Sequence, residues 1–261
     1  DFIYMAIRRP HKPPTSATEV FDIDTAVGNT AAQSFIETGF PVDLSLTRPL
    51  SSGLSFFLFD RLRGGSDNSY NYLQSALRES EISGTGHAYD FAYNTGIKQT
   101  LLGPGGSGTQ LFYNLRRAPG FFDIVSYEGT GSSRDLSHNL GVVPELIIQK
   151  RTNVNGEWHV FANSVTSPNS EWYLNFGNLN GTFSLENNFG STGISGSPTN
   201  TVIPLGNSNN LNGSTNTFVM YLFASQPGVS KVGSYSGTGS NIDVDCGFAA
   251  GARFILIKRI E

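Results

Sequence analysis

The chain has 261 residues, of which 15% are charged and 12% aromatic, with 30 glycines, one cysteine and a formal net charge of −4 at pH 7. It has no lysine or arginine tract, so it lacks the electrostatic signature of a nucleic-acid-binding protein. No apolar run reaches the roughly 20 residues that cross a bilayer, and a single cysteine excludes an intrachain disulfide and a cysteine-based zinc site. We expect an all-β fold, because aromatic residues pack well on pleated sheets and glycine allows tight turns between short strands.

Residues 1–20 begin with the strand-like run DFIYMAIRR and continue into the proline-bearing connector RRPHKPP. Because this run starts in the middle of a strand pattern, we expect the chain to be a fragment of a longer polypeptide. The sequence predicts that residues 1–20 are the closing strand of an upstream module followed by a connector.

Residues 21–118 are predicted to form a first β-module of about a hundred residues. VFDIDTAVGNT and TGFPVDLSLTR (38–48) look like a weaker copy of a pattern that recurs later in the chain. NYLQSALRESE (71–81) places Leu73, Ala76 and Leu77 on one helical face. The sequence does not decide whether residues 71–81 form a helix.

Residues 119–226 are predicted to form a second module, a β-sandwich of the jelly-roll type. Its strand signals are FDIVSY, PELIIQK, WHVFA, WYLNF and FVMYLFA. Asn-Gly pairs at 155–156, 180–181 and 212–213 mark turns, because both residues tolerate a positive φ. The stretch 187–216 is so rich in Asn, Ser, Gly and Thr that we expect a long surface loop.

Two stretches of the chain repeat each other at a fixed spacing. Residues 119–151 align without a gap with residues 227–259, which lie 108 positions further on, and 12 of the 33 aligned positions are identical. The identities centre on a Tyr-x-Gly-Thr-Gly-Ser segment, at 127–132 and again at 235–240. We therefore interpret residues 227–261 as the opening strands of a third, truncated module.

The strand that ends each module follows the same spacing. DFIYMAIRR (1–9), TQLFYNLRR (109–117) and TFVMYLFAS (217–225) are separated by successive steps of 108 residues. The repeat predicts a closing strand at each of these three places.

Ser137 and His138 resemble part of a catalytic site. A serine nucleophile needs a histidine base within hydrogen-bonding reach and a third group that orients the base. Adjacent residues of a strand point to opposite faces, and the aligned residues of the repeat are Asp245 and Cys246, which do not preserve the chemistry. The pattern favours a structural position at the rim of a module, so we expect no catalytic residues and no enzyme activity.

Two further patterns have a functional and a structural interpretation. The Gly-Thr-Gly segments at 129–131 and 237–239 lack the helix and lysine that follow in a phosphate-binding loop, so we predict β-hairpin turns. Asp243 and Asp245, with Asn241, could offer oxygen ligands to calcium. Solvent-facing polar alternation explains them better, and we predict neither a metal site nor a cofactor.

The candidate glycan-binding residues are Trp158, Trp172, Asn188 and Asn207. The two tryptophans could stack on a sugar ring, and a buried core position is the alternative for each. The two asparagines belong to the stretch 187–216, and loops on a rigid sandwich often carry recognition.

Basic residues recur at the module borders. Examples are Arg61, Arg63, Arg116-Arg117 and Lys150-Arg151. We expect them to pair with acidic residues of adjacent modules or subunits.

A family resemblance is carried by the segments YNLRRAPGFFDIVSYEGTG, LSHNLGVVPELIIQKR, VMYLFA, GSYSGTGS and GFAAGARFILIKR. They resemble the repeated β-rich modules of tail-fibre and related virion proteins of marine bacteriophages, particularly cyanophages. The connector IYMAIRRPHKPPTSATEVF is similar to the one that recurs between such modules. The resemblance is strongest over 109–155 and 217–261, and it implies a structural protein of the virion with no catalytic residues to carry over.

We therefore expect a structural component of a bacteriophage virion, in a tail fibre or appendage that acts in host attachment. Proline-bearing connectors predict a stiff rod of modules. The expected partners are further copies of the chain, as a homotrimer by analogy with fibres, other virion proteins and a host-surface glycan. The alternatives are a carbohydrate-binding (lectin-like) module, a capsid decoration or head fibre, and a glycan depolymerase.

Overall fold

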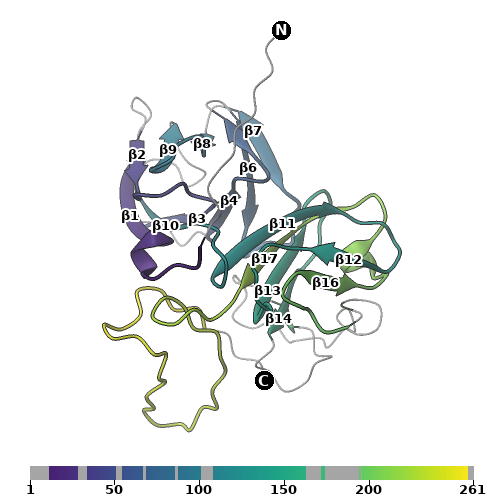
Figure 1. Ribbon diagram of the computed structural model, residues 1–261. Helices are drawn as coiled ribbons and strands as arrows, with labels where there is room; N and C mark the ends of the chain where they lie inside the picture. The colour runs from purple at the N-terminus through teal and green to yellow at the C-terminus, as the bar shows by residue number, and fades with distance from the viewer. Residues whose placement is uncertain are drawn as a thin grey trace.

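The computed structural model describes residues 12–28, 34–50, 55–66, 69–85, 88–100, 108–162, 172–173, 194 and 196–257. In this part of the chain the fold is all-β, as predicted, and antiparallel sheets form two β-rich modules (Figure 1). The helical elements described are one 3-10 turn, η1 (Ala17–Glu19), and the four-residue α1 (Asn209–Asn212). Within the same ranges, no helix has the length and apolar character required to cross a bilayer.

The first module contains a seven-stranded sheet and a three-stranded sheet. The large sheet has the strand order β1-β10-β3-β4-β6-β5, with β7 paired to β6, and the small sheet has the order β2-β9-β8. The strands are β1 (Phe21–Gly28), β2 (Ser34–Glu37), β3 (Leu44–Pro49), β4 (Phe57–Asp60), β5 (Gly65–Ser66), β6 (Ser69–Gln74), β7 (Ile82–Thr85), β8 (Ala88–Asp90), β9 (Gly96–Thr100) and β10 (Gly108–Leu115).

The second module contains a five-stranded sheet of order β11-β17-β13-β14-β15 and a two-stranded sheet, β12-β16. The strands are β11 (Phe122–Glu128), β12 (Arg134–Ser137), β13 (Leu146–Arg151), β14 (Trp158–Ala162), β15 (Trp172–Tyr173), β16 (Val202–Leu205) and β17 (Thr217–Phe223). Each of the five sequence runs predicted to be a strand overlaps one of β11, β13, β14, β15 and β17, so these predictions are confirmed.

The two modules have the same strand order. In each, the last strand lies between the first strand and the third strand and is antiparallel to both: β1-β10-β3 in the first module corresponds to β11-β17-β13 in the second. The register also matches when the closing-strand residues Leu115 and Phe223, which are 108 positions apart, are taken as equivalent. Leu115 pairs with Phe21 and Leu44, and Phe223 pairs with Phe122 and Leu146. We call β10 and β17 the closing strands.

The two large sheets pack face to face, so that the modules share a core. In β17 the side chains of Phe218, Met220 and Leu222 pack towards the small sheet of their own module. The alternate residues Val219 and Tyr221 join a cluster with residues of the first module, as expected for side chains that point to opposite faces of a strand. The layers are therefore three-stranded, seven-stranded, five-stranded and two-stranded, and both large sheets are buried on both faces.

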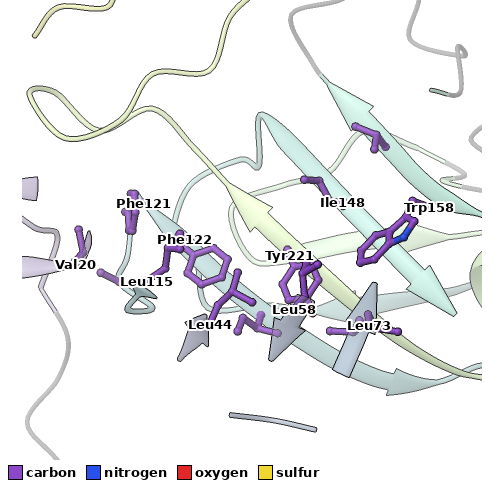
Figure 2. Close-up of a cluster of buried hydrophobic side chains, with 14 residues drawn as sticks. Val20, Leu44, Leu58, Leu73, Leu115, Phe121, Phe122, Ile148, Trp158 and Tyr221 are labelled. Atoms are coloured by element: carbon purple, nitrogen blue, oxygen red, sulfur yellow. The ribbon is translucent and has the colours of Figure 1, made fainter. Parts of the chain in front are cut away.

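The shared core is a continuous apolar cluster. Figure 2 shows Leu44, Leu58 and Leu73 of the first module gathered with Ile148 and Trp158 of the second. These side chains are at most 7% exposed. Since burial of one such side chain contributes roughly 1.5–3 kcal/mol, the modules stabilise each other across this interface. The sequence predicted modules held in a rod by connectors. In the structure the two modules are also held together by this shared core.

A buried polar cluster completes the interface between the modules. The Arg63 guanidinium lies 2.6 Å from the Asp60 carboxylate, whose Oδ2 also accepts a hydrogen bond of 2.8 Å from the Tyr221 hydroxyl of the second module. Arg63 also pairs with Glu81, at 2.8 Å. Burial raises the pKa of Tyr221 well above its ordinary value, so the hydroxyl stays protonated and donates.

Main-chain groups also join the two modules, along the segments 74–81 and 150–158. The Trp158 indole donates to the Gln74 carbonyl at 3.2 Å, and the Gly156 N–H donates to the Arg78 carbonyl at 2.7 Å. The fully buried Lys150 donates to the carbonyls of Arg78 and Gly156. Burial lowers the pKa of Lys150 to about 8, and these carbonyls satisfy its ammonium group.

The possible helix over 71–81 is not formed. Residues up to Gln74 belong to β6, and a turn and an irregular segment follow. Tyr72 packs in the core of the first module and Leu73 in the shared core. Adjacent residues buried on opposite sides require a strand, so tertiary packing overrides the helical spacing.

A long surface loop was expected at 187–216 from its composition, but part of this stretch is regular structure that packs in the core. Its described part contains Ile194, β16 and α1. Ile203, Leu205 and Leu211 are fully buried in the core of the second module. The prediction failed because the composition of the stretch is mostly polar, whereas these few apolar side chains decide its position in the core.

Residues 227–257 contain no strand, although strands are expected there from the repeat. The segment forms long loops beside the two modules (yellow in Figure 1), and most of its residues are exposed. It makes some contacts with the modules: the ring of Phe254 lies 5.1 Å from that of Tyr113 and 6.2 Å from that of Phe21.

Candidate functional site

Ser137 and His138 do not form a nucleophile and base pair. Ser137 is exposed at the end of β12, whereas His138 is 5% exposed. The His138 Nδ1 accepts a hydrogen bond from the Leu140 N–H, and Nε2 lies 3.2 Å from the carbonyl oxygen of Thr199. Burial lowers the pKa of His138. The imidazole therefore fastens β12 to the loop before β16, in the structural position expected from the repeat.

The Gly-Thr-Gly segment at 129–131 leads the chain from β11 into β12. The predicted β-hairpin is wrong, because β11 and β12 belong to different sheets and pair with β17 and β16. The Asn212 side chain donates to the Ser132 carbonyl at 2.7 Å and accepts from the Thr130 N–H at 3.1 Å. A Cβ on Gly129 would overlap the carbonyl oxygen of Gly213, so this close approach requires glycine. The turn thus docks onto the end of α1 and offers no helix N-terminus to an anion.

The aspartates considered as calcium ligands, Asp243 and Asp245, are exposed. The Asp245 carboxylate accepts the Gly247 N–H at 2.7 Å. Nowhere in the described ranges do three or more His, Cys, Asp or Glu side chains gather in a way that could hold a metal ion.

Two of the four candidate glycan-binding residues, Trp158 and Asn207, have side chains that the structure describes. Trp158 is 2% exposed and lies in the shared core, which is the structural alternative considered for it, so its ring has no open face for a sugar. Trp172 belongs to β15 and pairs with Val160. Asn207 is exposed between β16 and α1. Asn188 lies outside the described residues.

A polar pocket at one edge of the first module is the strongest candidate site. It has a volume of about 360 Å³ and is lined by Pro41, Asp43, Arg61, Asn94 and Arg117. Three of these residues flank adjacent strands of one sheet, because Asp43 precedes β3, Arg61 follows β4 and Arg117 follows β10. In an antiparallel sheet the start of one strand lies beside the ends of its neighbours, and this places the carboxylate between the two arginines.

The pocket contains two guanidinium groups around one carboxylate. The Nε atoms of Arg61 and Arg117 lie 3.2 and 3.3 Å from the same oxygen of Asp43, whose side chain is 3% exposed. The Arg61 guanidinium also donates to the Val42 carbonyl, at 2.7 and 3.0 Å. The side chains of Arg61 and Arg117 keep 28% and 29% exposure. The resulting excess of positive charge suits a carboxylate, sulfate or phosphate group of a ligand.

The carboxylate itself has a structural role that both modules share. Asp43 accepts the Arg117 N–H at 2.8 Å, and Glu145, at the equivalent place before β13, accepts the Ser225 N–H at 2.9 Å. In each module the acid therefore holds the main chain of the second residue after the closing strand. The guanidinium groups distinguish the first module, since Ser225 stands 108 positions after Arg117.

Arg61, Arg63 and Arg117 do pair with acidic residues, but the expectation that these acids belong to adjacent modules or subunits is wrong for all three. Their partners Asp43, Asp60 and Glu81 all belong to the first module. The sequence did not single out the pocket, because Asp43, Arg61 and Arg117 are far apart in the chain. Their meeting depends on the strand order.

Comparison with known protein families finds a match. The family described as Domain of unknown function (DUF7483) matches residues 116–261, which include the second module and the segment that repeats its first strands. No curated protein and no solved structure matches the chain. Because the matched residues make up more than half of the 261 positions, the chain belongs to the DUF7483 family.

Proposed function

We propose that the chain is a structural segment of a bacteriophage virion, in a tail fibre or other appendage that acts in attachment to the host. The observation that carries the proposal is the duplicated module, with the same strand order and register twice and a core shared between the copies. A core shared between two copies of a β-module resists their separation, which suits a structural protein. The sequence resemblance to phage tail-fibre modules is the reason why we propose a virion appendage and not another kind of structural protein.

The chemistry of the polar side chains also supports a scaffold. His138, Lys150 and Arg63, which would be candidates for catalysis by residue type, are buried and bonded to main-chain carbonyls or to carboxylates. Such groups specify and stiffen a fold.

Immunogold labelling with an antibody raised against the purified chain tests the proposal. We expect gold particles on an appendage of intact virions of the virus that encodes the chain. Antibody preabsorbed with the chain is the control and should give bare particles. Label confined to the head would favour the decoration or head-fibre alternative. Detection of the chain in infected cells but not in purified virions would contradict a virion function.

A second candidate function, recognition of an acidic host glycan, is favoured by the pocket of Asp43, Arg61 and Arg117. Two guanidinium groups can hold a uronate carboxylate or a sulfate in forked hydrogen bonds, and the exposed Asn94 offers an amide to a sugar hydroxyl. In this proposal the sugar is held by the charged pocket and not by stacking on Trp158 and Trp172.

Arg117→Gln is expected to weaken binding of uronate or sulfated oligosaccharides by roughly tenfold or more, since one charge-assisted hydrogen bond contributes about 1.5–3 kcal/mol. The main-chain bond from residue 117 to Asp43 persists in this variant. Calorimetric titration at low and physiological salt measures the effect. Arg78→Gln, which removes the same charge from an exposed pair with Glu157, should bind like the unchanged chain. Equal affinities for the Arg117→Gln variant and this control would exclude the pocket.

A further inference from the structure

β1 is an edge strand of the seven-stranded sheet. It stands first in the strand order, and among the strands that the structure describes its ladder partner is β10. Figure 1 shows it in purple at the outer margin of the first module. A strand at the edge of a sheet presents main-chain N–H and C=O groups that can pair with a further strand. β1 has eight residues, so its edge is long enough to accept one.

The odd-numbered residues of β1 direct their main-chain groups away from the sheet. The Arg116 N–H donates to the Val20 carbonyl at 2.9 Å, so residue 20 is a hydrogen-bonded position of the ladder with β10. Opposite residues in an antiparallel pair alternate between hydrogen-bonded and non-hydrogen-bonded positions. The N–H groups of Ile23 and Thr25 therefore point outwards.

Two aspartates bind these outward N–H groups. The Asp24 Oδ1 accepts the Thr25 N–H at 2.6 Å. The Asp22 carboxylate accepts the Ile23 N–H. In both cases a side chain, and not a neighbouring strand, satisfies the main chain at the edge. A strand that added to β1 here would have to displace both carboxylates.

The two aspartates are unfavourable for the first module itself. They lie on the same face of β1, and burial and the nearby Asp24 charge raise the pKa of Asp22. The second module does without this pair. Phe122 occupies the place of Phe21 in the ladder, so Val125 stands where Asp24 does, and Val125 packs against the core. The carboxylate of Asp24 therefore has a role other than stabilising its module.

We propose that Asp22 and Asp24 protect the edge of β1 against pairing with β1 of a second copy of the chain. Two identical antiparallel strands are related by a twofold axis, so the same edge serves both copies. A pair centred on Asp24 places this residue opposite itself, and a pair centred on Ile23 places Asp22 opposite Asp24. Like charges directly opposite each other on neighbouring strands are destabilising. The aspartates thus oppose the pairing by their charge as well as by their hydrogen bonds.

This inference goes beyond the proposed function and does not depend on it. The acid pair acts against self-association of the chain, wherever the protein is located. Charged side chains are one of the general means by which proteins keep edge strands from pairing with other chains.

Sedimentation of the full chain over a range of concentrations tests the proposal. In the variant Asp24→Val, which introduces the residue of the second module, we expect the average mass to rise towards twice that of the unchanged chain. Asp243→Val makes the same replacement at an exposed position outside the described strands, and it should behave like the unchanged chain. An Asp24→Val variant that has the same mass as this control at every concentration overturns the proposal.

The variant Asp24→Asn separates the hydrogen bond from the charge, because its amide oxygen can still accept the Thr25 N–H. We expect it to associate more weakly than Asp24→Val and more strongly than the unchanged chain. Association as strong as that of Asp24→Val would contradict the protective role of the hydrogen bond. Complete absence of association would contradict the role of the charge. Circular dichroism should give the same β-content for both variants.

A fluorescent label shows whether association uses the edge of β1. Thr25 is exposed, and Ser126, at the equivalent place in β11, is exposed as well. In a chain with Asp24→Val and with the free cysteine removed by Cys246→Ser, pyrene on Thr25→Cys should give excimer emission, which requires two labels in contact. Pyrene on Ser126→Cys should not. Equal emission from both positions, or excimer emission from Thr25→Cys in a chain that keeps Asp24, would overturn the proposal.

Discussion

Replacement of Asp60 by alanine is expected to lower the free energy of unfolding by about 3–5 kcal/mol, the cost of leaving a buried charge without its partner. The Asp60 carboxylate is fully buried and holds Arg63 at 2.6 Å, while its oxygens accept hydrogen bonds from the Tyr221 hydroxyl and the N–H groups of Leu62 and Arg63. The variant keeps Arg63 between two sheets with Glu81 as the remaining carboxylate.

Urea denaturation followed by fluorescence and circular dichroism measures this loss. The matched control is Glu157→Ala, which removes a carboxylate from a pair whose arginine, Arg78, has a side chain 70% exposed. Exposed pairs contribute about 0–1 kcal/mol, so the control should change little. A change of less than about 1 kcal/mol for Asp60→Ala would show that the cluster is not buried between the modules as described.

Replacement of Trp158 by alanine is expected to cost about 3–5 kcal/mol, the range for removal of a large buried aromatic side chain. The indole fills the shared core from the second module, and its N–H bonds to the Gln74 carbonyl of the first. Its loss leaves a cavity and an unpaired carbonyl at the same interface.

The stability of the Trp158→Ala variant is compared with that of Val154→Ala, at a position 39% exposed after β13. We expect a single unfolding transition for the unchanged chain, because the core is shared, and a large shift of that transition only for Trp158→Ala. If Trp158→Ala left the stability unchanged and abolished sugar binding, Trp158 could not be buried as described. Such a result would favour the hypothesis that its ring stacks on a sugar.

Local patterns in the sequence predicted much of the fold. The strand runs of the second module and the closing strands predicted at 109–117 and 217–225 were confirmed, the latter by β10 and β17. The closing strand predicted at 1–9 lies outside the described residues. The hairpin predicted at the Gly-Thr-Gly segment was wrong, because β11 and β12 belong to different sheets. The face-to-face packing of the large sheets was not predicted. Its signal was the unbroken apolar run from Phe218 to Ala224, since a strand that is apolar on both faces is covered on both faces. The apolar spacing around Leu73 suggested a helix. The segment is a strand instead, because side chains of β6 are packed on both of its faces.

The candidate site was less predictable than the fold. Trp158 was considered for binding because its residue type suits a sugar, yet the same properties suit a core, and only burial separates the two. Asp43 and Arg117 are 74 positions apart in the chain, and no spacing rule joins them. They meet because β10 lies beside β3, and that adjacency is a property of the strand order.

The position of the closing strands bears on how the protein is made. Phe21 pairs with Leu115, and Phe122 pairs with Phe223, so the first strand of each module leaves the ribosome long before its partner exists. Such long-range pairing makes folding slow and leaves apolar strands exposed during synthesis. Each module therefore stays open during synthesis until the strand that pairs with both its first and its third strand has emerged.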